Sequence, residues 1–351
     1  LQPPSLGGPA MLRVRMLSGA EVTSVPLEEL SDVRCLKQRL THLHGFPPRF
    51  RQRLLLHGAN LEDAAELDCP MSLDLVLLPF ADASAAQVDD LVANARVAAT
   101  EEVELMLQRP QDPDLPDSHS RRALDAASQH GCVEVVRLLL EAGASKDLAS
   151  NRGSTALLLA CTNGHVDVVR ALLAARADTE AADCDGRTAL MAASQWGHLE
   201  VARLLLEAGA DKDKVNFDGR TALLTASCCG EDEVARLLLE AGADTDLANV
   251  GGSTALMMAA LLGHVRISRL LLEAKAETDV SDNRGRTALM AASESGHDEV
   301  VRLLLEAGVD KDLEDDSGCT AFVAASRRGN VEVARLLQES EASEYVADPC
   351  C

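Results

Sequence analysis

The sequence predicts two parts of different fold class: a small α+β domain, followed by an all-α array of about eight helix pairs with a period of 33 residues. Two observations predict the array, because glycines and alanines each recur at this period in one common register. A third observation predicts the first domain: residues 11–80 lack the period and show strand-like and helix-like patterns instead. The recurring glycines are Gly131, Gly164, Gly197, Gly230, Gly263, Gly296 and Gly329.

Composition excludes several classes of function. The chain has 351 residues, with 33 Lys+Arg against 56 Asp+Glu and a formal charge of -23. Such an acidic surface repels phosphate groups, so no nucleic-acid partner is expected. The longest uncharged apolar run, residues 255–262, is far shorter than the roughly 18 residues of a membrane span, so membrane association is not expected either. Ten cysteines without a CxxC pair indicate reduced thiols, which favours the cytoplasm, with the nucleus as a second location. We also expect a monomer.

The first ten residues contain neither the basic nor the apolar region of a secretory signal, and we expect a disordered leader over 1–10. Because the first residue is Leu1, we expect the sequence to be a fragment or to have lost its start, with Met11 as the candidate initiator.

Residues 11–80 predict a small sheet packed on one helix. Met11 to Met16 alternate as a half-buried strand, and Val33, Leu36, Leu40 and Leu43 follow helical spacing up to a terminating Gly45. The predicted elements, in chain order, are strands over 11–16 and 21–26, a helix over 33–43, and strands over 52–56 and 73–78.

This domain resembles ubiquitin through Gly45-Phe46-Pro47-Pro48, Gln52-Arg53-Leu54, Gly58 and Leu61-Glu62-Asp63, which all fall in family order. The resemblance implies a β-grasp fold and a partner-binding apolar patch at Leu17, Leu55 and Val76. It also implies partners in the ubiquitin or proteasome pathway. The alternative is that this N-terminal domain, which we call the head, is inert. Its patch is then buried against the array or serves only as packing on the sheet.

One repeat, residues 183–215, illustrates the array. An Asp-x-x-Gly sequence predicts a tight turn, and Thr188 is the expected N-cap of a short helix that Gly197 ends. A second, more apolar helix follows, and Gly209 is its expected C-terminal cap. Arg176 and Lys275 stand where this glycine is expected in two other repeats. Two such short helices cannot bury their apolar surface alone, so the units must stack.

The period of 33, the Thr-Ala-Leu helix start, the Gly-His pair and the LLLEAGAD segment closely resemble the ankyrin repeat family. The resemblance implies a curved solenoid with a concave face that binds proteins. The expected boundaries are a linker over 81–87, an array over 88–340 and a tail over 341–351. The array consists of an N-terminal cap repeat over 88–116 and seven repeats over 117–340.

On the face that ankyrin partners commonly touch, the sequence predicts an apolar strip across three adjoining repeats. The alternative is that these side chains only pack on neighbouring helices. The strip combines the ends of first helices with turn tips, and its members are Trp196, Phe217, Cys228, Cys229, Val250, Leu261 and Leu262.

No metal or cofactor site is predicted. Histidines recur at 165, 198, 264 and 297, but repeats lie roughly 10 Å apart and zinc ligands must each lie within about 2 Å of the ion. No catalytic residues are predicted, because the sequence contains no known nucleotide-binding or hydrolase motif and no base is locatable beside Cys228-Cys229.

These observations favour a non-enzymatic adaptor, with the array binding one protein and the head a second. The rivals are a plain ankyrin scaffold with an inert head, a thiol enzyme at Cys228 or Cys229, and a lipid-tethered regulator modified at Cys350 or Cys351.

Overall fold

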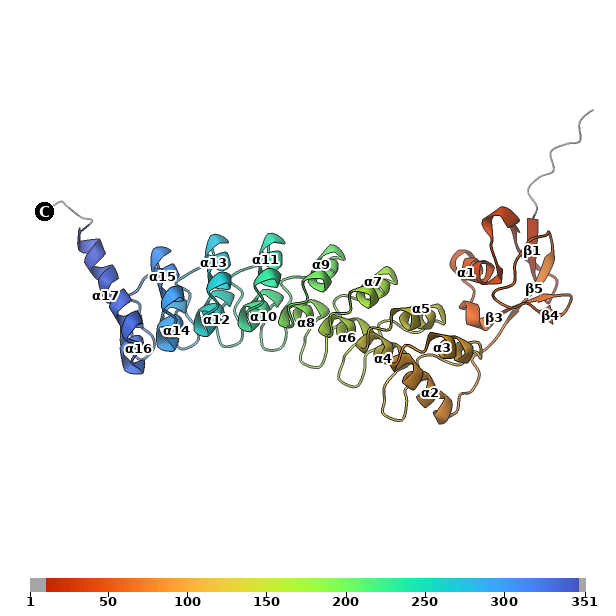
Figure 1. The fold of residues 1–351 in the computed structure, drawn as a ribbon, viewed down its shortest axis with the longest axis horizontal. Coiled ribbons are helices and arrows are strands. Elements are labelled where there is room, and N and C mark those ends of the chain that lie inside the picture. The colour runs from red at the N-terminus through yellow and green to blue at the C-terminus, as the bar shows by residue number, and fades with distance from the viewer. Residues whose placement is uncertain (1–10, 347–351) are drawn as a thin grey trace, which may run out of the picture. The chain divides into compact units, whose positions relative to one another are not determined.

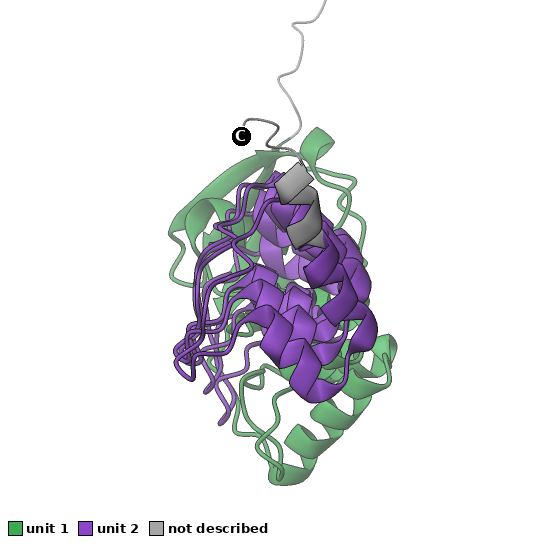
Figure 2. Cartoon of the chain, turned by 90° about the vertical axis from the view of Figure 1, so that its left-hand side faces the viewer, with its two compact units in different colours: residues 1–146 green, residues 147–351 purple. Residues whose placement is uncertain are grey.

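The computed structural model describes residues 11–346, with side chains as far as residue 339, and divides the chain into two units. Figure 2 colours them separately, residues 1–146 and residues 147–351. The first unit contains the sheet and the first helices of the array, and the second contains helices only. The expected leader over 1–10 and the pair Cys350-Cys351 lie outside the described residues.

The N-terminal sheet has five strands in the order β2-β1-β5-β3-β4. The central strands β1 and β5 run parallel, and every other neighbouring pair is antiparallel. Alternation along each strand sends one set of side chains inward, such as Leu73 and Leu75 on β5, which are fully buried. The strands are β1 (Met11–Met16), β2 (Glu21–Pro26), β3 (Gln52–Leu56), β4 (Ala59–Asn60) and β5 (Ser72–Leu77).

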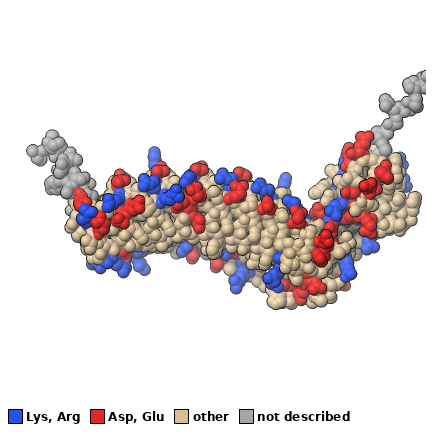
Figure 3. Space-filling view, viewed as in Figure 1, with Lys and Arg blue, Asp and Glu red and all other residues tan. Residues whose placement is uncertain are grey.

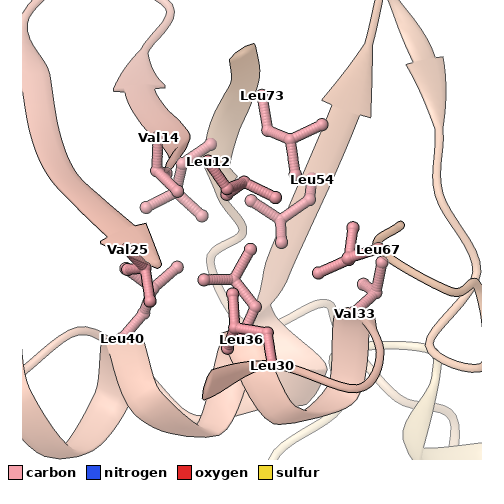
Figure 4. Close-up of a cluster of buried hydrophobic side chains, with 11 residues drawn as sticks. Leu12, Val14, Val25, Leu30, Val33, Leu36, Leu40, Leu54, Leu67 and Leu73 are labelled. Carbon is pink, nitrogen blue, oxygen red and sulfur yellow. The ribbon is translucent and has the colours of Figure 1, made fainter. Parts of the chain in front are cut away.

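Helix α1 (Val33–His44) packs across one face of this sheet. It begins at Asp32, whose carboxylate accepts a hydrogen bond from the Cys35 amide at 2.8 Å, and ends at Gly45 in a left-handed conformation. Figure 4 shows the core between them, where side chains of α1 and the strands point toward one another. The cluster consists of Leu12, Val14, Val25, Leu30, Val33, Leu36, Leu40, Leu54, Leu67, Leu73 and Leu75.

The structure corrects the predicted strands in two places. It adds β4, a two-residue strand that pairs with Leu55 and Leu56 and was not predicted. Both of its residues are exposed, so it carries no alternation that a sequence could reveal. The last strand covers 72–77 instead of 73–78. The third strand has the predicted bounds, and the helix over 33–43 extends by one residue to His44.

A buried arginine joins this sheet domain to the helices that follow it within the first unit. Arg49 is 2% exposed, and its guanidinium contacts three carboxylates: Asp63 at 2.5 Å, Glu104 at 3.0 Å and Glu141 at 2.7 Å. Burial disfavours the charge of Asp63, but hydrogen bonds and charge attraction from Lys37 and Arg49 outweigh it and hold the pKa of Asp63 below its ordinary value. Each buried charge is thereby compensated.

Four helices follow the sheet in the first unit. Helix α2 begins at Ala85, inside the expected linker over 81–87, because Ser84 and Gln87 form a capping box that starts it early. Ala98 adopts a left-handed conformation between α2 and α3, at the position that glycine holds in later repeats. The helices are α2 (Ala85–Arg96), α3 (Thr100–Leu107), α4 (Ala123–Gln129) and α5 (Val133–Glu141).

The second unit is a row of helix pairs, seen in Figure 1 from α6 to α17. We call the first helix of each pair inner and the second outer. Helix α17 continues to Val346, past the expected end of the array at residue 340, and ion pairs of Arg335 with Glu332 and Glu339 support it. The inner helices are α6 (Ala156–Thr162), α8 (Ala189–Gln195), α10 (Ala222–Cys229), α12 (Ala255–Leu262), α14 (Ala288–Ser295) and α16 (Ala321–Arg328). The outer helices are α7 (Val166–Ala174), α9 (Leu199–Glu207), α11 (Asp232–Glu240), α13 (Val265–Glu273), α15 (Asp298–Glu306) and α17 (Val331–Val346).

Each pair packs on the next through small and large side chains in alternation. Inner helix α8 contacts α6 and α10, and its Ala189, Ala192 and Ala193 are fully buried, so the helix axes can approach closely. Outer helix α9 contacts α7 and α11 in turn, and its Leu205 is fully buried. The core of the second unit is therefore a strip shared by adjoining pairs.

At the two helix ends where the sequence has Arg176 and Lys275 in place of glycine, the backbone keeps the left-handed conformation. Arg176 and Lys275 adopt φ of 60° and 63°, in the left-handed region where the equivalent Gly209 and Gly242 have φ of 88° and 74°. A side chain is strained in this conformation by about 1 kcal/mol relative to glycine.

We therefore expect Lys275→Gly to raise the free energy of unfolding by about 1 kcal/mol, because it removes the strain at Cβ. Denaturant unfolding followed by circular dichroism measures the change. Lys275→Ala is the matched control: it removes the charge but keeps Cβ, and should leave the strain in place. Equal effects of the glycine and alanine variants would show that the gain comes from the side chain and not from the backbone.

A buried acid interrupts the apolar positions of the inner helices in the first unit. Asp125 on α4 is 7% exposed, whereas the equivalent positions in the next repeats are Leu158 and Met191. Burial raises the pKa of Asp125 from 3.8 to about 6, although Arg122 opposes the shift. The folded state binds this proton more tightly than the unfolded state does. The free energy of unfolding therefore falls as the pH rises from about 4 to about 6.

Asp125→Met is expected to raise the free energy of unfolding by about 2 kcal/mol at pH 7, because it removes the buried charge. Asp125→Asn, which keeps the shape and loses the charge, should give a gain at pH 7 that disappears at pH 4. Unfolding in denaturant at both pH values tests this. A difference from wild type that stays constant between pH 4 and pH 7 would contradict the role of the charge.

Candidate functional site

The turns between repeats form a ladder in the second unit. Asp183 accepts hydrogen bonds from the backbone amides of Asp185 at 3.0 Å and Arg187 at 2.9 Å, which closes the turn. The Phe217 amide of the next turn donates to the Asp185 carbonyl at 3.1 Å, and the Val250 amide donates to the Asp218 carbonyl at 2.8 Å. Successive turn tips are therefore fixed side by side, which places Phe217 and Val250 along one ridge.

Glycine permits this close approach. Gly186 has a φ of 76°, and a Cβ there would come within 2.9 Å of the Phe217 backbone nitrogen. The position therefore needs glycine both for its conformation and for space.

The inner helices rise from these turns, and their far ends complete the face. In the second unit each begins at a threonine whose hydroxyl accepts an amide hydrogen bond, as Thr221 does from Leu224 at 3.1 Å. Trp196 caps the end of α8 and is 54% exposed, and Leu262 at the end of α12 is 44% exposed. We call these helix ends and the turn tips over repeats α8 to α12 the inner face.

The structure brings some residues of the predicted strip together and separates others. Phe217, Cys228 and Cys229 line one hollow of about 270 Å³. Leu261 lines a smaller one of about 20 Å³ with Met257 and Met258. Trp196, Phe217, Val250, Cys229 and Leu262 are exposed, whereas Cys228 and Leu261 are half-buried, and neither hollow is lined by Trp196, Val250 or Leu262.

The larger hollow also contains polar residues that the sequence did not single out. Arg187, Gln195 and Arg220 line it, together with Asp185 and Asp218 and with Asn216 and Thr225. The signal for them was present in the repeat register, because Arg187 and Arg220 lie 33 residues apart.

The turn arginine normally has carboxylate partners within its own repeat. Asp282 receives Nε and Nη2 of Arg286 at 3.0 Å and 2.7 Å. Burial opposes the charge of Asp282, but the amides of Arg286 and Arg284 and the Arg286 guanidinium outweigh it and lower the pKa of Asp282 below its ordinary value. Asp183 holds Arg187 in the same way.

The recurring histidines have a structural role between repeats. Nε2 of His198 lies 3.2 Å from the Thr162 carbonyl, and Nε2 of His297 lies 3.2 Å from the Leu261 carbonyl. A carbonyl only accepts, so Nε2 carries the proton and donates. In residues 11–346 no group of three or more His, Cys, Asp or Glu is placed to hold a metal ion.

The vicinal cysteines do not have the character of a nucleophile. Burial raises the pKa of both Cys228 and Cys229, and the nearby charge of Arg220 opposes the shift without reversing it. A catalytic cysteine requires the opposite, a lowered pKa that yields the thiolate at neutral pH.

The predicted patch of the N-terminal sheet lies on its outer face. Leu54 points into the core, so its neighbour Leu55 points outward, and Val76 does so beside the buried Leu75. Leu55 pairs with Asp74, which makes Val76 its diagonal neighbour across β3 and β5. Leu17 follows β1 in the turn toward β2 and is 67% exposed.

Acidic and basic side chains are interspersed along the edge formed by the outer helices of the second unit (Figure 3). Arg236 pairs with Glu233, and Arg203 with Glu200, between successive turns of one helix. Such exposed pairs contribute only about 0.3–0.5 kcal/mol each. They keep the outer edge polar, in contrast to the exposed apolar residues of the inner face.

Comparison with protein families gives two matches. A model described as ankyrin repeats (3 copies) matches residues 143–216, 210–282 and 270–348. A second model, described as ankyrin repeat, matches residues 121–151. No curated protein matches the chain. Among the described residues, none of the helices has the length and apolar character needed to cross a membrane.

Proposed function

The chain belongs to the ankyrin repeat family, and from this premise we propose that it is a non-enzymatic adaptor that binds one protein through its inner face. The observation that carries the proposal is the exposure of Trp196 and Phe217 on adjoining repeats; Phe217 also lines the hollow of about 270 Å³. Large aromatic side chains dominate the binding energy of protein interfaces. We further propose that the helix pairs continue as one solenoid with this face on its concave side.

The N-terminal domain is proposed to be ubiquitin-like and to offer a second binding surface. Support comes from the strand order β2-β1-β5-β3-β4, with a parallel central pair and one helix across the sheet. The outward Leu55 and Val76, with the exposed Leu17, form the surface on which partners from the ubiquitin or proteasome pathway would dock.

Two binding surfaces on one chain give the proposed mechanism. A partner bound at the N-terminal domain is held near a client bound at the inner face, which raises the effective concentration of the partner around that client. The domain itself does not act as a conjugated tag, because the chain continues through Leu78 and Pro79 into helix α2 without a free C-terminal Gly-Gly.

The inner face is tested by capturing partners from cell extract with the whole chain and with a Trp196→Ala/Phe217→Ala variant. We expect the recovered client to fall by about tenfold or more, because the variant removes two exposed aromatic anchors. Quantitative mass spectrometry measures recovery. Val331→Ala is the control, since Val331 is 78% exposed but lies at the start of α17, outside the inner face. Equal recovery by wild type and the double variant would refute the role of the face.

The head is tested in the same way with Leu17→Ala/Leu55→Ala/Val76→Ala. Proteins of the ubiquitin or proteasome pathway should be lost from the captured set, while the client of the inner face is retained. Leu43→Ala is the control, because Leu43 is 63% exposed on α1, away from the patch. If the triple variant recovers the same pathway proteins as wild type, the head is inert and the chain is a plain scaffold.

A further inference from the structure

One repeat keeps the turn arginine but has lost both of the side chains that hold it elsewhere. In the preceding repeat, Arg187 contacts Asp183 at 2.9 Å and Gln195 at 3.3 Å. Three repeats further on, Arg286 contacts Asp282 at 2.7 Å and Glu294 at 3.7 Å. The equivalent trio at a shift of 33 residues from the first is Asn216, Arg220 and Cys228.

Asp183 has two roles: it accepts the amides of its turn and it pairs with the arginine. Asn216 fulfils only the first of these. Its Oδ1 accepts the backbone amides of Arg220 at 2.8 Å and Asp218 at 3.0 Å, so the turn is intact. A neutral amide cannot pair with the guanidinium as the Asp183 carboxylate does. Among the described residues, Arg220 has no carboxylate within the 4.0 Å of an ion pair, and its buried Nε has no hydrogen-bond partner.

This unpaired guanidinium lines the hollow of about 270 Å³ next to Phe217, which is 75% exposed. The site thus combines a cationic fork with an exposed aromatic ring and the half-buried Cys228. A guanidinium without an acceptor leaves hydrogen bonds unmade, and a ligand that reaches it from the hollow and supplies an acceptor gains free energy from those bonds. Asp185 and Asp218 also line the hollow, so a dianionic phosphate would be repelled more strongly than a singly charged carboxylate.

We propose that Arg220 is a carboxylate-binding subsite of the inner face, which takes an Asp or Glu side chain from an extended segment of the protein partner. That carboxylate replaces the one that Asn216 lacks and binds the guanidinium fork through two parallel hydrogen bonds. An apolar side chain next to it in the partner packs on Phe217. The inference rests on the proposed function and adds the chemistry of the segment that is recognised.

Two opposite variants test the subsite. Arg220→Gln removes the cation, and Asn216→Asp supplies the intramolecular carboxylate that Asp183 and Asp282 provide in their own repeats. Asp282→Asn is the matched control, because it makes the reverse exchange of Asn216→Asp at the equivalent turn position of another repeat, away from the hollow. Since Asn216→Asp restores a pair found elsewhere in the chain, it keeps the test valid even where Arg220→Gln disturbs folding.

The whole chain is used to select binders from a random peptide library, and dissociation constants are measured by fluorescence polarisation. Each selected peptide is compared with forms in which one Asp or Glu is changed to Asn or Gln. With wild type and Asp282→Asn, one such change should weaken binding about tenfold or more. With Arg220→Gln and Asn216→Asp the same change should have no effect, which is the coupling that a double-mutant cycle detects.

The outcomes separate the subsite from the proposed function. Peptides that depend on Trp196 and Phe217 but show no coupling to Arg220 overturn the subsite and leave the adaptor role. A phosphoserine peptide that binds more tightly than its Asp form, or competition by inorganic phosphate beyond that of chloride at equal ionic strength, overturns the carboxylate assignment. Failure of wild type to select any peptide overturns the subsite and counts against recognition of extended segments by the inner face.

Discussion

The second unit depends on one constraint: no helix pair contains enough apolar surface to bury its own side chains. The inner helices are thin because alanines such as Ala192 and Ala193 fill their packing faces, and each outer helix places a leucine such as Leu205 between its neighbours. The core is completed only when pairs stand side by side. This requirement fixes the distance between repeats, and that distance in turn lets a single backbone hydrogen bond link each turn tip to the next.

Most elements of the repeats could be predicted from the 33-residue period of the sequence. Helix starts follow from the recurring threonines, and the unusual backbone at Arg176 and Lys275 could be predicted because glycine holds the same position in other repeats. Strand β4 could not be predicted, since two exposed residues carry no pattern. The early start of α2 depends on the Ser84–Gln87 capping box, which lies outside the repeated register.

Only the apolar part of the candidate site could be predicted from the sequence, because that prediction also depended on the repeat register. Exposed apolar residues such as Phe217 and Trp196 could be placed from the register, because the family resemblance indicates which positions face partners. Arg220 matches the turn arginine of other repeats and therefore looks ordinary by itself. Its distinction lies in two missing partners, Asn216 for an aspartate and Cys228 for Gln or Glu, and the structure was needed to show that these positions meet around one hollow.

The buried Arg49 makes the N-terminal domain less modular than its sequence suggests. Two of its three carboxylates, Glu104 and Glu141, belong to helices α3 and α5, so the energetic boundary of the domain lies beyond the end of its sheet. A deletion that ends near residue 80 would leave both glutamates without their common cation. Arg49 therefore couples the sheet domain energetically to α3 and α5, so a substitution at Arg49 and one at either glutamate are expected to have non-additive effects on stability.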